Sequence, residues 1–102
     1  MVIYFGLGSS ALSKGSMSVL DKAAAKAKGG KTVSLQAHTD TSGSAATNKA
    51  LSIKRAKAAS AYLKSKGLTK VYTTANGENA PAVNSGDNKV EAKNRRVEIE
   101  IN

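Results

Sequence analysis

The apolar residues of this chain change their spacing several times, and this change constrains the fold more than any other feature. Alternate residues share one face in a strand, whereas residues three or four apart share one face in a helix. Strand-like spacing or apolar β-branched runs occur at residues 2–5, 33–38, 70–75 and 95–101. Helical spacing occurs at residues 11–28 and from between 44 and 48 to about 66. The sequence therefore predicts the order β-α-β-α-β-β.

This order limits the architecture. Two helices are too few to cover both faces of a four-stranded sheet, so we expect both on one face. The predicted fold class is α+β: a two-layer sandwich with a four-stranded mixed sheet. Strands joined through a helix are expected to be parallel neighbours or near-neighbours, connected by right-handed crossovers. A length of 102 residues predicts one domain over residues 1–102.

The composition of the chain excludes some classes of functional site and favours others. The formal net charge is +9, which favours anionic partners. Aromatic residues make up only 4% of the chain, so the core must consist mainly of Ala, Val, Leu and Ile. There is no cysteine, which excludes disulfides, thiolate metal sites and cysteine nucleophiles. Neither a membrane-spanning run nor a signal peptide is predicted, so any export signal or membrane anchor of a parent protein is expected outside this sequence.

Arg55 breaks the amphipathic pattern of the second predicted helix. At 100° per residue, it falls near the middle of the apolar arc that contains Leu51, Ala59 and Tyr62. An arginine at a core edge can extend its charged end to solvent or pair with a structural carboxylate. A buried guanidinium without a partner costs several kcal/mol, roughly, so we expect a carboxylate from the chain or from a ligand.

Asp40 is the best-placed acidic residue in the chain. It follows the predicted second strand and precedes the second helix, a position where ligands commonly bind in α/β layers. The other acids are predicted on solvent-facing positions or in loops. Asp40 and Arg55 could therefore lie on opposite sides of a small pocket, and a ligand with one ammonium and one carboxylate would satisfy both.

Several motifs in the right order resemble the OmpA-like peptidoglycan-binding domain family, which includes domains of OmpA, Pal and MotB. They are "HTD" at residues 38–40, the N-x-x-L-S-x-x-R-A pattern at 48–56, "NGE" at 76–78 with Pro81, and "NRRVEI" at 94–99. The resemblance covers nearly the whole chain. Two departures are Ala37, where a glycine usually precedes "HTD", and "TANGENAP" in place of a glycine–aromatic–glycine–glutamate run.

The resemblance implies binding of the diaminopimelate in the stem peptide of Gram-negative peptidoglycan. Asp40 would hold its ammonium and Arg55 its carboxylate, because an arginine fork can grip a carboxylate bidentately. Thr39, Asn48 and Arg95 are further ligand-binding candidates. Asn48 could instead be a helix N-cap, and Arg95 could instead brace Asp40.

Three neighbouring residues are given structural or solvent-exposed roles. Tyr62 is expected in the core, His38 in a structural role and Arg96 in solvent.

The implied setting is a periplasmic domain of an outer-membrane or membrane-anchored protein, with no cofactor, no metal and no catalysis. Two other functions remain open at this point. One is nucleic-acid binding, which the charge supports but the scattered lysines and scarce aromatics do not. The other is a dimerisation module with the same fold. An enzyme is disfavoured, because no nucleophile motif or paired carboxylates occur.

Overall fold

The computed structural model describes residues 1–39, 44–77 and 94–102, and these form two helices and four strands in the predicted order. In chain order the elements are β1 (Val2–Tyr4), α1 (Lys14–Ala27), β2 (Val33–His38), α2 (Ala45–Ser65), β3 (Val71–Gly77) and β4 (Arg96–Ile101). The predicted boundaries agree with these bounds to within a few residues. The predicted loop between β3 and β4 lies almost wholly outside the described residues.

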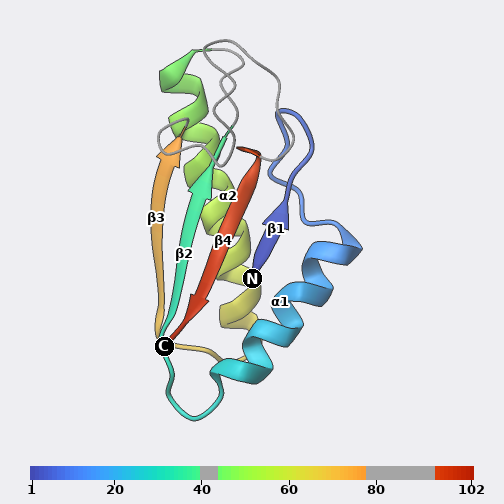
Figure 1. The fold of residues 1–102 in the computed structure, drawn as a ribbon, viewed down its shortest axis with the longest axis vertical. Helices are drawn as coiled ribbons and strands as arrows, with labels where there is room; N and C mark the ends of the chain where they lie inside the picture. The colour runs from blue at the N-terminus through green and yellow to red at the C-terminus, as the bar shows by residue number, and fades with distance from the viewer. Residues whose placement is uncertain (40–43, 78–93) are drawn as a thin grey trace.

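The strands form one mixed sheet in the order β1-β4-β2-β3 (Figure 1). β2 and β3 are parallel, while β4 is antiparallel to both β1 and β2. β1 and β2 therefore run in the same direction with β4 between them. The expectation of parallel neighbours or near-neighbours is confirmed, and the last strand of the chain occupies a central place in the sheet.

Both helices pack on the same face of this sheet. α2 lies behind β2 and β3, and α1 lies beside β1 (Figure 1). One cluster of buried side chains joins the two layers, which confirms the predicted one-sided sandwich. The cluster contains Ile3, Phe5, Leu20, Ala23, Ala24, Ala27, Val33, Leu35, Ala37, Ala56, Ala59, Leu63, Val71, Val97 and Ile99.

The helix ends follow local sequence signals. Ser13 and Ser44 are the N-caps of α1 and α2, and their hydroxyl oxygens accept from the amides of Ser16 and Thr47. Cap geometry places the start of α1 at Lys14 rather than Ala11. Beyond the C-terminus of α2, Gly67 has φ 93°, a left-handed conformation that favours glycine. Neither described helix combines the length and apolar character needed to cross a membrane.

Candidate functional site

Arg55 lies in the interior of the protein, as its helical position predicts. Its neighbours Ala56 and Ala59 belong to the core, and its side chain has no exposed surface. Among the side chains buried to this degree, Arg55 is the largest. Packing of α2 against the sheet therefore buries a guanidinium between the two layers.

The guanidinium donates three hydrogen bonds to backbone carbonyls. Nε donates to Ser9 O at 2.9 Å, Nη1 to His38 O at 3.0 Å, and Nη2 to Gly6 O at 3.1 Å. Cζ also lies 5.2 Å from the centroid of the Phe5 ring, within cation–π range. Arg55 thus ties the β1–α1 connection to the C-terminal end of β2.

The partners of Arg55 in these bonds are carbonyl oxygens, which were not predicted from the sequence. We expected a carboxylate, but carbonyl oxygens also satisfy buried guanidinium donors. The three bonds fix the direction of the guanidinium. A guanidinium held in a fixed direction suits bidentate recognition of a carboxylate.

Thr39 and Asn48 contribute buried polar atoms near the same end of β2. Thr39 follows directly after His38, whose carbonyl binds Arg55, and Asn48 lies seven residues before Arg55 on the same face of α2. The two residues are 1% and 4% exposed. Within the described part of the chain, Thr39 Oγ1 and Asn48 Nδ2 have no hydrogen-bond partner.

Asn48 is not the N-cap of α2. Ser44 takes that role, and Asn48 lies within the first turns of the helix. The N-cap alternative is therefore wrong. A buried amide nitrogen without a partner costs about 1–3 kcal/mol, so Asn48 is a poor choice for stability alone.

The two adjacent arginines differ in their surroundings. Arg95 is half-buried, and its Nε donates to Phe5 O at 3.0 Å, so it contacts the segment that also carries the ring beneath Arg55. Arg96 is on the outward face, as predicted, but the prediction that it is solvated is wrong. It is 5% exposed, and its Nε donates to Glu98 Oε2 at 3.1 Å. The ion pair with Glu98 compensates the guanidinium for the loss of solvent.

His38 belongs to the same outward cluster. Its Nε2 lies 3.2 Å from Glu98 Oε1, and the imidazole is buried. Burial alone would raise the pKa of Glu98, but the hydrogen bond and charge of Arg96, together with His38, lower the pKa overall. The structural role predicted for His38 agrees with this contact, and no metal-binding group of three ligands occurs among residues 1–39, 44–77 and 94–102.

The structure thus brings four of the five predicted site residues to one end of the sheet: Thr39, Asn48, Arg55 and Arg95. Asp40 falls in residues 40–43, outside the described residues. Sequence reasoning missed the carbonyls of Gly6 and Ser9, because a carbonyl direction has no signature in residue type. It also missed the Glu98–His38 contact, although both residues have outward parity on predicted strands.

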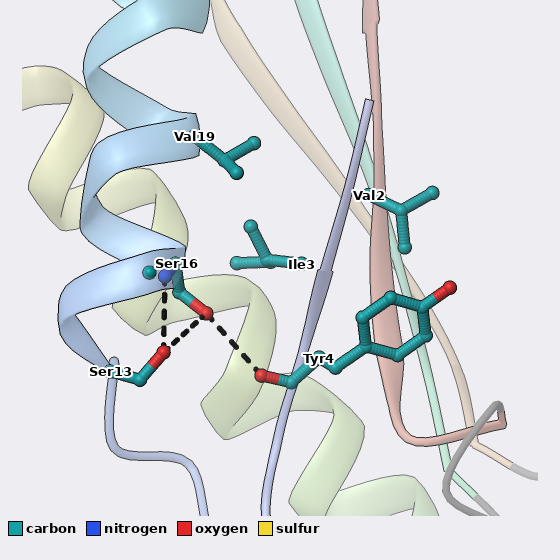
Figure 2. A pocket seen from close by; sticks show the side chains of 7 residues that line it. Val2, Ile3, Tyr4, Ser13, Ser16 and Val19 are labelled. Carbon is teal, nitrogen blue, oxygen red and sulfur yellow. Dashed lines mark hydrogen bonds between the residues drawn. The ribbon is translucent and has the colours of Figure 1, made fainter.

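Another concave region lies between β1 and the first turns of α1, and its polar groups bind one another. Ser13 Oγ donates to Ser16 Oγ at 3.1 Å, and Ser16 Oγ donates to Tyr4 O at 3.4 Å (Figure 2). Val2, Ile3, Gly15 and Val19 complete the lining, which holds no charged side chain. We interpret this region as a structural contact between the N-terminus of α1 and the edge strand β1, rather than as a ligand site.

Comparison with known proteins agrees with this architecture. The family model described as "OmpA family" matches residues 4–95. Outer membrane protein A of Bordetella avium is 35% identical over 102 residues, which is 96% of this chain and 53% of that protein. The peptidoglycan-associated lipoprotein of Pseudomonas aeruginosa is 37% identical over 99 residues, which is 94% of this chain and 59% of that protein. The chain thus spans little more than half the length of these relatives.

Solved structures show the same fold. The peptidoglycan-associated lipoprotein of Burkholderia pseudomallei superposes with a TM-score of 0.89 at 25% identity, over 99% of this chain and 89% of that one. The C-terminal domain of Helicobacter pylori MotB gives a TM-score of 0.82 at 20% identity, over 100% of this chain and 84% of that one. The family model covers both helices together with β2 and β3, and the chain belongs to the OmpA family.

Proposed function

We propose that this domain binds peptidoglycan non-covalently, through the diaminopimelate of the stem peptide. The observation that carries the proposal is a pair of buried polar atoms, Thr39 Oγ1 and Asn48 Nδ2, that have no hydrogen-bond partner among the described residues and lie at the same end of β2 as the buried guanidinium of Arg55. The names of two relatives, which are peptidoglycan-associated lipoproteins, support the ligand class. In this proposal the domain is a non-catalytic anchor in the periplasm, and it belongs to an outer-membrane or membrane-anchored protein.

Each candidate residue has a role that follows from its chemistry. The free end of diaminopimelate carries an ammonium and a carboxylate on one carbon. Arg55 would bind the carboxylate and Asp40 the ammonium. Thr39 Oγ1 and Asn48 Nδ2 would bind polar atoms of the stem peptide, which would satisfy two buried groups that have no partner among the described residues. Arg95 would add positive charge at the rim.

The burial of Arg55 makes a further demand on this proposal. The guanidinium has no exposed surface, so binding requires that the chain around it opens. Part of the free energy of ligand binding must then offset this rearrangement, and we expect modest affinity for an isolated stem peptide.

A comparison of two ligands tests the proposal without changing the protein. Muropeptides whose stem carries diaminopimelate are titrated beside matched muropeptides that carry lysine, with binding followed by NMR. Lysine lacks the second carboxylate, so we expect binding to weaken by at least about tenfold, as for the loss of one charge-assisted hydrogen bond. Equal affinity for the two ligands would contradict the role given to Arg55.

Pull-down with purified sacculi tests the residues. Asp40→Asn and Arg55→Lys keep the size of each side chain nearly constant, and both are expected to reduce retention. Lys54→Gln removes a charge from the exposed face of α2 and serves as the control. If both site variants are retained as well as this control, the proposal that Asp40 and Arg55 bind the ligand is wrong. Thermal unfolding of each variant shows whether a loss reflects the site or the fold.

A further inference from the structure

A second candidate site lies at the opposite end of the sheet. β2 and β3 both begin there, and the α1–β2 and α2–β3 connections lie side by side (Figure 1). The connections line an open cavity of about 290 Å³, formed by residues 27–31 and 66–70. Val33 N donates to Lys70 O at 2.9 Å, which holds the start of β2 against the α2–β3 connection. We call this region the lysine cavity.

The lining of the lysine cavity is strongly basic. Lys28, Lys31, Lys66 and Lys70 line it, and no acidic residue does. Lys66 has a counter-charge outside the lining, because its Nζ lies 3.4 Å from Asp21 Oδ1. Lys70 Nζ donates to Gly30 O at 3.3 Å, a neutral acceptor. The four ammonium groups thus have one carboxylate contact within the described part of the chain.

Helix stability explains only part of this arrangement. Lys28 and Lys66 follow the C-termini of α1 and α2, where a positive charge is favourable beside the helix dipole. Lys31 and Lys70 lie beyond the helices, just before β2 and β3. The four side chains are exposed, so repulsion between them is weak, and a bound anion would turn their shared positive potential into an attraction. Helix ends do not account for Lys31 and Lys70, which lie on the two connections that line the cavity.

We infer that the lysine cavity binds a phosphate-bearing anion. Lysine is a compact, rotatable cation that suits the multiple charge of a phosphate, whereas planar carboxylate recognition favours arginine. The volume exceeds that of a single phosphate ion, which leaves room for an attached group. Anionic lipid headgroups and soluble phosphorylated molecules share this chemistry. The inference does not rest on the proposed peptidoglycan binding, since the two sites lie at opposite ends of β2.

Two double variants of equal net charge test the inference. Lys31→Gln/Lys70→Gln removes the two cavity lysines that helix ends do not explain. Lys14→Gln/Lys54→Gln removes two exposed lysines outside the cavity and is the matched control. The probes are sodium pyrophosphate, followed by NMR, and vesicles of phosphatidylcholine with or without phosphatidylglycerol, followed by co-sedimentation. Sacculus pull-down of both variants is the independent readout and should remain unchanged.

We expect the wild-type chain to bind at least one phosphate-bearing probe, and the cavity variant to bind it about 30-fold more weakly. This factor follows from about 1 kcal/mol for each of the two lysines and about tenfold in affinity for each 1.4 kcal/mol. The control variant should lose about twofold or less. Binding of phosphatidylglycerol vesicles alone would assign lipid headgroups, and pyrophosphate binding alone would assign soluble phosphates. Equal losses in the two double variants, or no binding of either probe, would overturn the inference.

Discussion

Replacement of Arg55 by methionine should destabilise the fold, apart from any effect on ligand binding. The substitution leaves three carbonyl acceptors without their donor. The bond to His38 O is buried, and an unsatisfied buried acceptor costs about 1–3 kcal/mol. The bonds to Ser9 O and Gly6 O are partly buried, and each contributes about 0.5–1.5 kcal/mol. The total loss is about 2–6 kcal/mol.

Two effects move the expected value toward the lower half of this range. Methionine refills much of the vacated volume, and it removes the desolvation cost of a buried charge. We therefore expect the free energy of unfolding to fall by about 2–4 kcal/mol. For a domain of this size the midpoint of thermal unfolding should fall by at least about 8 °C.

Urea unfolding followed by far-UV circular dichroism measures this effect. The midpoint should decrease while the slope m stays constant, which would show a change in stability rather than in compactness. Lys54→Met on the exposed face of α2 is the control for the substitution itself. A loss below about 1 kcal/mol would refute the reasoning, because it would mean that water or other donors replace the guanidinium at no net cost.

Three further predictions concern single groups. The pKa of Glu98 is lowered in the folded chain, so its contribution to stability is present above the pKa of about 4.5 in the unfolded chain and is lost as the pH falls through the folded pKa. In urea unfolding from pH 7 to 3, the free energy of unfolding should therefore decline less for Glu98→Gln than for wild type. Parallel declines in the two proteins would contradict this. The hydrogen bond from Tyr62 to Asp21 raises the pKa of the phenol, so Asp21→Asn should lower that pKa in an NMR titration, whereas an unchanged value would rule the contact out in solution. Thr39→Val removes a buried hydroxyl without a partner among the described residues, so it should weaken sacculus retention while stability stays equal or rises in thermal unfolding; a clear loss of stability would show that the hydroxyl has a structural partner.

The periodicity of the sequence was sufficient to predict the layers of this fold. Leu20 and Leu63 lie on the apolar faces of their helices, and both are fully buried. The place of β4 between β1 and β2 was not predictable in the same way. Alternation in "RRVEIEI" specifies which side chains face the core, but it does not specify which strands become neighbours.

The candidate site shows the same division between residue type and backbone position. Arg55 could be assigned to the core from its angle on the helix, because that angle depends only on local geometry. Its carbonyl partners could not be predicted, because Gly6 and Ser9 come close to Arg55 only when β1 and α2 pack together. Arg96 was assigned to solvent for a related reason. Strand parity indicates a face, but burial on that face depends on tertiary neighbours such as Glu98, which parity does not specify.

The polar atoms at the end of β2 differ in what they imply about function. The bonds of Arg55 are a sufficient structural reason for its burial, so its presence alone does not require a ligand. Thr39 Oγ1 and Asn48 Nδ2 have no such compensation among the described residues, and an apolar side chain of similar size would stabilise the fold at either position. These two atoms therefore argue for a bound polar ligand more strongly than the arginine does. The decisive variants are accordingly those that leave stability intact and change retention alone, with Thr39→Val the first among them.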